Sequence, residues 1–198
     1  MKTDLKLTGF AKRSLEKKKA ILVAARELFF QKGPVKTSMA EIAARASVSQ
    51  VSIYNYFLDK NKLIEIVVTE HLEKSLAAAE KILDLELPFR EKMARFFSLG
   101  EKKDLGINDD SLGQFNWQDP KLRQIYNAFV TEKQIPFLLR FIEMGKQEGA
   151  IKQELANDAI MAYFMANMSI YQDKDFLRKG TQYISSLTHL FFYGLLGK

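Results

Sequence analysis

The chain has 198 residues, of which 47% are hydrophobic, and it contains no cysteine. This length suffices for one large domain or two small ones that share a core. The lack of cysteine excludes disulfides, thiolate metal sites and cysteine nucleophiles, and it fits a reducing cytoplasm, where we expect the protein to act. The longest apolar stretches fall far short of the roughly 20 residues that span a bilayer, and residues 1–5 lack the apolar run of a secretion signal, so we expect no membrane partner.

The charge of the chain is concentrated near its beginning. Residues 1–62 hold 13 basic and 5 acidic side chains, a net charge of +8, whereas the remainder holds 17 basic and 19 acidic side chains, a net charge of −2. A basic head on a slightly acidic body indicates a polyanionic partner. The cluster formed by Lys12, Arg13 and residues 17–19 is either a contact to a phosphate backbone or only a solvated face.

The first elements in chain order are helical. Apolar residues recur at helical spacing over residues 15–31, which predicts an amphipathic helix. Gly33 and Pro34 end it, because glycine commonly follows a helix and proline does not continue one. Ser38 and Glu41 have the spacing of a capping box, which predicts a short second helix from that point.

A third short helix completes the N-terminal region. A turn over residues 46–48 and a capping serine, Ser49, predict a helix that reaches residue 57. Beyond it the chain keeps a helical period, and no strand-like alternation persists. We expect further helices over residues 59–84, 88–99, 119–147, 157–171 (with Asn157 as its cap) and 175–196, and a loose segment over residues 100–119. Pro136 removes a backbone donor and predicts a kink. The predicted fold is therefore all-α.

A helix, a capped helix, a tight turn and another capped helix form the layout of a helix-turn-helix DNA reader. In a helical projection of the third helix, Ile53 and Phe57 face inward, while Val51 and Asn55 point outward. Ser52 and Tyr54 lie on the flanks. An outward valine suits contact with a thymine methyl group, and the amides of asparagine and glutamine, as at Gln50, can bond both N6 and N7 of adenine.

A family resemblance becomes specific at these residues. The sequence TSMAEIAARASVS at residues 37–49, then IYNYF at 53–57 and KNKL at 60–63, resembles the DNA-binding signature of the TetR/AcrR family, and the match extends over residues 15–75. The resemblance implies that Gln50, Val51 and Asn55 face bases and that Thr37, Tyr54, Tyr56 and Lys60 hold phosphates. We include Ser38 and Ser52 among the candidate DNA-binding residues. Two positions depart from the family, which usually has glycine at Ser47 and often has histidine at Tyr56.

The resemblance also implies two domains: a helix-turn-helix DNA-binding domain over residues 1–62, and a helical ligand-binding and dimerisation domain over residues 63–198. The last predicted helix carries an apolar stripe that is larger than a helix facing water needs. We expect this stripe to form a homodimer interface with the 160–171 helix; the alternative is an ordinary core helix within one chain. The interface candidates are Tyr183, Leu187, Leu190, Phe191 and Gly194.

The pocket of a ligand-binding domain is harder to place from sequence. Methionine-rich, aromatic-lined surfaces suit apolar ligands, although such a stripe is more often plain core. The candidates for a small hydrophobic ligand are Phe115, Trp117, Tyr126, Phe129, Met161, Phe164, Met165, Asn167 and Met168.

Three classes of function remain to be weighed. An enzyme is disfavoured, because His71 and His189 lie far apart and neither a glycine-rich phosphate loop nor a zinc motif occurs. We expect neither a cofactor nor a metal site. A helical adaptor that binds only proteins leaves the basic head unexplained. The favoured interpretation is a regulator that binds a palindromic double-stranded DNA operator and, as the family implies, acts as a repressor released by a small apolar ligand. The alternative is a DNA-binding regulator with a vestigial pocket or under the control of a protein partner.

Overall fold

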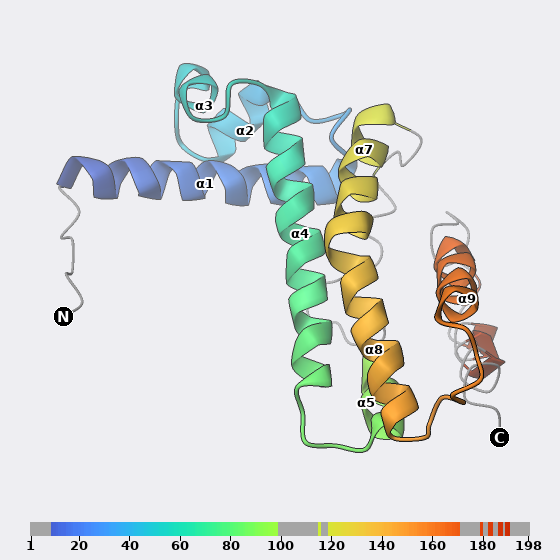
Figure 1. Ribbon diagram of the computed structural model, residues 1–198. Helices are drawn as coiled ribbons and strands as arrows, with labels where there is room; N and C mark the ends of the chain where they lie inside the picture. The colour runs from blue at the N-terminus through green and yellow to red at the C-terminus, as the bar shows by residue number, and fades with distance from the viewer. Residues whose placement is uncertain are drawn as a thin grey trace, which may run out of the picture. The chain divides into compact units, whose positions relative to one another are not determined.

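A computed structural model describes residues 9–98, Phe115 and residues 119–170, together with seven residues between Lys179 and Leu190. Every regular element in these parts of the chain is helical (Figure 1), so the all-α prediction is confirmed. No helix within the same residues is both long and apolar enough to cross a membrane.

The described residues divide into two compact units. Unit 1 holds the residues up to His71, Phe115 and residues 119–125; unit 2 holds residues 72–98 and those from Tyr126 onward. The division falls within helix α4 (Lys60–Leu83), as does the predicted domain boundary between residues 62 and 63.

Unit 1 is built on three helices whose ends are set by local sequence. These are α1 (Gly9–Lys32), α2 (Met39–Arg45) and α3 (Gln50–Phe57). The capping box at Ser38 is formed, and the Ser49 side chain accepts from the backbone of α3, so both predicted caps are confirmed. Helix α1 begins earlier than the predicted residue 15, because the alanine, lysine and arginine residues before that point are strong helix formers.

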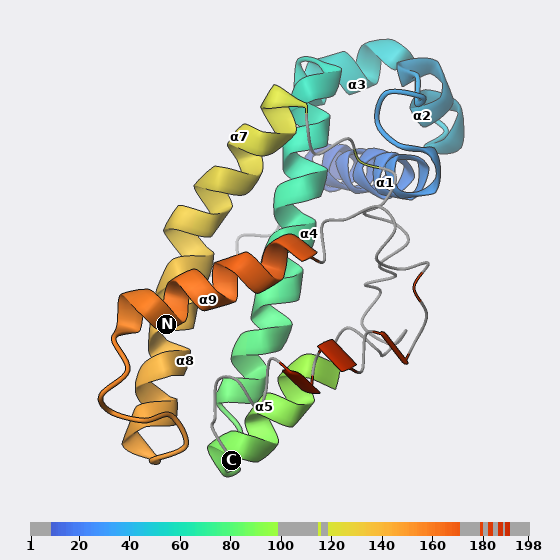
Figure 2. The same cartoon turned by 90° about the vertical axis from the view of Figure 1, so that its right-hand side faces the viewer.

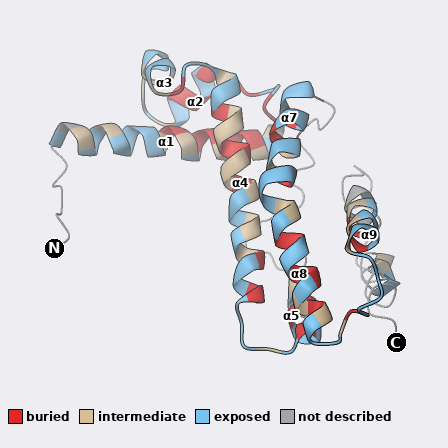
Figure 3. Ribbon diagram, in the orientation of Figure 1, coloured by how far each residue is buried: buried red, intermediate tan, exposed pale blue. Residues whose placement is uncertain are grey.

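The core of unit 1 lies where α1, α2 and α3 meet. Figure 3 shows α1 mostly exposed along its N-terminal half and buried along its C-terminal half. The residues at this junction that are completely or almost completely buried are Ile21, Ala25, Phe29, Ile42, Ile53 and Phe57. Burial of these side chains fixes α3 against α2 and α1, and burying each large one fully contributes about 1.5–3 kcal/mol.

Phe115, from the segment between α5 and α7, also belongs to unit 1. Its ring centroid lies 5.3 Å from that of Phe30 on α1, and Phe30 lies 4.8 Å from the imidazole of His71 on α4. Phe115 is only 1% exposed. The helical face around α1 and α4 is therefore closed by a residue that is distant in sequence.

Unit 2 contains α5 (Phe89–Ser98), the end of α7 (Pro120–Phe129), η2 (Val130–Gln134), α8 (Ile135–Gln147) and α9 (Asn157–Ile170). The helix predicted over residues 119–147 thus contains a π-helical turn directly before Pro136. The N–H of Ile135 donates to the carbonyl of Val130, five residues back. The sequence predicted a kink at the proline; the structure has this wider turn before it, which accommodates its missing donor.

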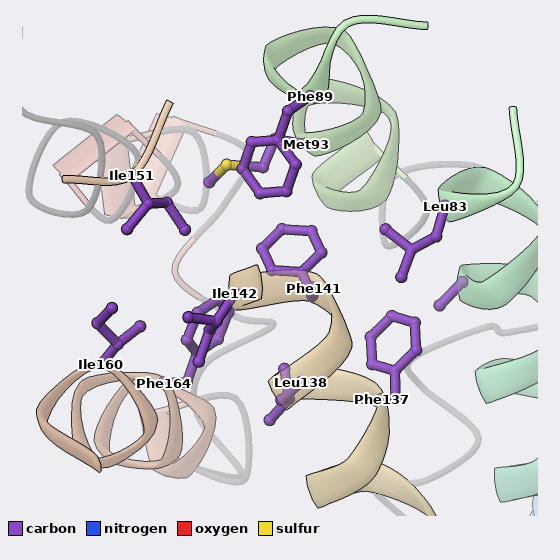
Figure 4. Packing of buried hydrophobic residues seen from close by; sticks show 11 residues of the cluster. Leu83, Phe89, Met93, Phe137, Leu138, Phe141, Ile142, Ile151, Ile160 and Phe164 are labelled. Atoms are coloured by element: carbon purple, nitrogen blue, oxygen red, sulfur yellow. The ribbon is translucent and has the colours of Figure 1, made fainter. Parts of the chain in front are cut away.

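Four phenylalanine side chains lie in the buried core of unit 2 among aliphatic residues (Figure 4). The Phe141 ring of α8 lies 4.7 Å from that of Phe89 on α5 and meets Phe164 of α9 edge-on, with centroids 5.8 Å apart. Helix α9 crosses α8 in Figure 2. A Cβ on Gly145 of α8 would lie 2.6 Å from the side chain of Ile151, so the close approach there requires glycine. Packing of aromatic rings therefore joins α5, α8 and α9.

Two polar contacts in unit 2 involve residues at the ends of helices. The Lys92 ammonium is buried and donates to the carbonyl of Leu83, 2.8 Å away, at the end of α4. The prediction that Asn157 caps its helix is wrong: its side-chain amide donates to Glu143 of α8, while the carbonyl of Ala156 accepts the first helical bond. Asn157 is instead the first residue of α9, so its side chain serves a contact between helices rather than a cap.

Candidate nucleic-acid interface

The outward face of α3 is the centre of the candidate interface. Ile53 and Phe57 are buried, whereas Val51 and Asn55 are exposed, as the helical projection predicts, and Gln50 is exposed as well. Val51 is 67% exposed, although it is apolar. The face thus offers two amides and one apolar side chain, which is the chemistry that reads base edges in a major groove.

Polar side chains flank this face. Tyr54 is exposed and Tyr56 is half-buried. Ser52 is half-buried, and its hydroxyl lies 2.9 Å from that of the capping residue Ser49. The backbone N–H of Ser52 donates to Ser49 Oγ over 3.1 Å. The start of α3 is therefore ordered by its own serines.

The turn before α3 has a left-handed residue. Ser47 has a φ of 53°, in the region that favours glycine. Its N–H donates to the carbonyl of Ala44 and that of Val48 donates to Ala43. The family that the sequence resembles usually has glycine at this position, and Ser47 adopts the left-handed conformation that favours glycine.

A second strained residue joins α3 to α4. Leu58 has φ 62° and ψ −61°, and the N–H of Asp59 donates to the carbonyl of Phe57 over 2.6 Å. These values describe a γ-turn, which is rare and strained for a leucine. Asp59 then caps α4, since its Oδ1 accepts from the N–H of Lys62. Because the turn is tight, Lys60 at the start of α4 follows closely after α3, which we call the recognition helix.

Lys60 is a partly desolvated cation. Partial burial lowers the pKa of its ammonium, and the negative charge of Glu41 opposes that shift. Desolvation strengthens attraction to an anion, so a phosphate would favour the charged form of Lys60.

The beginning of α2 carries a network around Glu41. Its carboxylate accepts from the Lys32 ammonium and from the backbone N–H and hydroxyl of Ser38. These contacts, Lys32 first, lower the pKa of Glu41 from 4.5 to about 2. The Ser38 hydroxyl is exposed, but its hydrogen is donated to Glu41.

Thr37 lies inside unit 1 rather than on its surface. It is 1% exposed, and its hydroxyl donates to the carbonyl of Gly33, 2.9 Å away, with the carbonyl of Leu28 at 3.3 Å. The hydroxyl thus ties the end of α1 to the start of α2. We therefore leave Thr37 out of the phosphate contacts proposed below.

Two contacts of α1 with α3 escaped the sequence reasoning. Ser14 Oγ donates to the hydroxyl of Tyr56 over 3.1 Å, and the Lys18 ammonium lies 5.8 Å from the centroid of the Phe57 ring. Lys18 is exposed like the other basic side chains of the cluster, but its ammonium also lies over an aromatic face. Extending the helical projection of α1 before residue 15 would have placed Ser14 on the same side as Lys18, four residues further on.

Comparison with known proteins gives these helices a family. The profile described as "Bacterial regulatory proteins, tetR family" matches residues 21–67. The uncharacterized HTH-type transcriptional regulator YhgD of Bacillus subtilis is 34% identical over 82 residues, 41% of this chain and 43% of that protein. The HTH-type transcriptional repressor Rv3405c of Mycobacterium tuberculosis is 38% identical over 69 residues, 35% of each chain. The aligned part spans less than half the length of each of these relatives.

A solved structure extends the likeness to the whole fold. The transcriptional regulator FadR from Bacillus subtilis, solved with stearoyl-CoA, superposes with a TM-score of 0.59 at 21% identity, over 90% of this chain and 99% of FadR. Residues 21–67 therefore match the DNA-binding region of the TetR family, and α2 and α3, which form a helix-turn-helix, lie within this match.

The predicted pocket candidates are distributed over both units. Phe115 lies in unit 1, whereas Phe164 is buried in the core of unit 2. Tyr126, Phe129, Met161 and Met165 are half-buried residues of unit 2. Trp117 and the side chains of Asn167 and Met168 lie outside the described residues.

The predicted dimer-interface candidates are described only in part. Tyr183 and Leu187 are half-buried, and Leu190 is 65% exposed. The ammonium of Lys179 lies 4.9 Å from the centroid of the Tyr183 ring. Phe191 and Gly194 lie outside the described residues, so the dimer interface stays a prediction.

Proposed function

We propose that this protein is a TetR-family repressor that binds a palindromic operator as a homodimer and releases it when a small apolar ligand binds unit 2. The observation that carries the DNA-binding part is the outward face of α3. Gln50, Val51 and Asn55 are exposed there, while buried Ile53 and Phe57 hold the helix in place. An exposed valine between two amides has little value for stability, and it has a use in a major groove.

The contacts are divided between bases and phosphates. Gln50, Val51 and Asn55 read base edges, and Tyr54, Tyr56 and Lys60 bind phosphates. Ser38 and Ser52 lie at the edge of this surface. The basic side chains on the exposed faces of α1, namely Lys12, Arg13, Lys17 and Lys19, add further neutralisation of the backbone.

Selection of bound duplexes from a random pool tests this division. Asn55→Ala is expected to lower operator affinity by about 1–3 kcal/mol and to relax the preference at one base pair in each half-site. Lys60→Ala is expected to weaken all sequences alike and to reduce the salt dependence of binding, because it removes one phosphate contact. The same selection pattern for both variants would contradict the assignment.

Lys74→Ala is the matched control for Lys60→Ala. Lys74 is an exposed lysine of the same helix, about 20 Å further along α4. That distance exceeds the Debye length of about 10 Å at 0.1 M salt, so its removal is expected to leave operator affinity unchanged. A protein that selects no sequence at all would overturn the proposed function.

The ligand that we propose carries a long acyl chain. Support comes from the half-buried methionine and aromatic side chains of unit 2, and from FadR, whose structure contains stearoyl-CoA. Met161 and Met165 beside the Phe164 ring suit a flexible apolar chain. Helix α4 carries Lys60 in unit 1 and extends into unit 2, which offers a continuous element through which a ligand can affect DNA binding.

Calorimetry with stearoyl-CoA, with and without saturating operator, tests the release mechanism. Binding to DNA and to ligand are linked reciprocally, so operator is expected to weaken ligand binding by the same factor by which ligand weakens operator binding, about 5–150-fold. Equal ligand affinities in the two titrations would mean that the pocket does not control DNA binding. The function would then be that of a DNA-binding regulator with a vestigial pocket or a protein partner.

The repressor assignment follows the relative Rv3405c, which is named a repressor. A reporter gene placed behind the selected operator is expected to be transcribed less when the protein is present. Higher transcription would show an activator.

A further inference from the structure

The hydroxyl of Tyr56 is held by a residue of α1. Ser14 and Tyr56 are separated by 42 positions in the sequence, and Ser14 Oγ donates to the Tyr56 oxygen over 3.1 Å. Both residues are half-buried. Packing of α1 on α3 therefore creates a contact that joins the N-terminal turns of α1 to the last turn of the recognition helix.

The direction of this bond matters for a phosphate contact. A phenol hydroxyl has one hydrogen to donate and two lone pairs that accept. A phosphate oxygen only accepts, so it needs the hydrogen of Tyr56. Because Ser14 supplies the hydrogen of this bond, the hydrogen of the Tyr56 hydroxyl remains available for another acceptor. A hydroxyl that accepts a hydrogen bond is polarised and becomes a better donor.

The tyrosine ring also contacts the ring of its neighbour Phe57. Its centroid lies 6.3 Å from that of Phe57, in an edge-on arrangement. Phe57 is buried, and the Lys18 ammonium lies over its ring, 5.8 Å from the ring centroid. A side chain that is ordered before binding loses less conformational entropy when it meets its partner.

We propose that Ser14 is a positioning residue for DNA binding: it orients and polarises the Tyr56 hydroxyl so that this hydroxyl donates to a phosphate of the operator. The inference rests on the proposed function. It assigns to α1 a role that does not require Ser14 to touch DNA. The competing explanation is that the bond only stabilises the packing of α1 on α3.

Four proteins separate these explanations: wild type, Ser14→Ala, Tyr56→Phe and the double variant. Operator affinity is measured by fluorescence anisotropy, and thermal unfolding is measured on the same samples. Ser14→Ala is expected to weaken operator binding about threefold to tenfold, the effect of one neutral hydrogen bond. It is also expected to leave the slope of log affinity against log salt unchanged, because no charge is removed.

The decisive comparison is made without the tyrosine hydroxyl. Adding Ser14→Ala to Tyr56→Phe is expected to have no further effect on affinity, since Ser14 acts through that hydroxyl. Ser14→Thr, which keeps a hydroxyl at this position, is expected to bind within about twofold of wild type.

Three results would overturn the inference. One is that Ser14→Ala lowers the unfolding temperature but leaves operator affinity unchanged, which indicates a packing role only. Another is that Ser14→Ala weakens binding equally in the Tyr56→Phe background, which indicates a direct contact of Ser14 with DNA or a general distortion. In both cases wild-type operator binding persists and the proposed function stands. The third result, a wild-type protein that selects no DNA sequence, would overturn both the proposed function and this inference.

Discussion

Two left-handed residues bracket the recognition helix. In the described part of the chain, Ser47 and Leu58 have a positive φ without being glycine. One precedes α3 and the other follows it. Backbone strain of this kind persists only where the surrounding structure imposes it, and it concentrates at functional sites. The strain here is the cost of setting the exit angles of α3, whose outer face must project from unit 1.

Replacing Ser47 with glycine is therefore expected to stabilise the protein. A left-handed conformation costs a non-glycine residue roughly 1–2 kcal/mol, and the greater freedom of glycine in the unfolded chain returns roughly 0.5–1 kcal/mol of that. We expect Ser47→Gly to raise the free energy of unfolding by about 0.5–1 kcal/mol, as measured by urea denaturation. Ser47→Ala keeps the strain and is expected to bring no gain. A less stable glycine variant would show that the serine hydroxyl matters more than its φ.

Glu41 gives unit 1 a dependence on acid pH. Its pKa is lowered to about 2 in the folded protein from 4.5. Between these values the unfolded chain binds more protons, so the free energy of unfolding falls as the pH falls from about 4.5 to about 2. Glu41→Gln is expected to flatten this part of the curve, and high salt to weaken it, because the carboxylate is exposed. Glu73→Gln, an exposed residue of α4, serves as the control. Parallel curves for wild type and Glu41→Gln would exclude this role.

At the scale of elements, the sequence predicts most where the signal is local. The capping box at Ser38 and the cap at Ser49 were predicted correctly, because each depends on residues three positions apart. For Pro136 the sequence predicted a kink, whereas the structure has a π-helical turn directly before it. Asn157 resembles a cap in sequence, but its amide bonds Glu143 on another helix. Competition between local and tertiary partners cannot be judged from spacing alone.

The site itself follows the same rule. The exposed and buried faces of α3 could be predicted from helical period, since eight residues, Gln50–Phe57, suffice to define them. The burial of Thr37 and the bond from Ser14 to Tyr56 could not, because both depend on how α1 packs. Periodicity identifies which side of a helix faces the core, but not which polar groups find a partner there.

The cap of α3 separates stability from DNA affinity. Ser49→Ala removes the acceptor for the N–H of Ser52 and is expected to lower the free energy of unfolding by about 0.5–2 kcal/mol. Ser49→Asp keeps an acceptor and is expected to keep stability, but its carboxylate lies at the start of the recognition helix and should repel phosphates. We therefore expect the aspartate variant to unfold like wild type and to bind operator more weakly. Unchanged operator binding by Ser49→Asp would indicate that the start of α3 does not approach the backbone.

At the scale of the whole molecule, neither unit is a continuous piece of chain. Helices α4 and α7 each contribute residues to both units, and Phe115 joins unit 1 from beyond α5. A boundary drawn in sequence at residues 62 and 63 cannot show this arrangement, because long-range packing leaves no local pattern. Phe115 was predicted as a ligand contact because it is aromatic; in the structure its ring lies beside that of Phe30, which in turn lies beside the imidazole of His71. In the proposed function, these shared helices carry the effect of a ligand bound in one unit to the other.

The last prediction concerns the assembly that a palindromic operator requires. Leu190 is 65% exposed. A second copy of the chain would bury this apolar side chain. We expect light scattering at micromolar concentration to give the mass of two chains for wild type and of one chain for Leu190→Glu, since a buried carboxylate without a partner is costly. Val35→Glu places the same charge on an exposed apolar residue of unit 1 and is expected to remain dimeric. A Leu190→Glu protein that stays dimeric would mean that the interface lies elsewhere. A monomeric wild type would exclude a symmetric dimer, and with it the two-fold symmetry from which the palindromic operator is inferred.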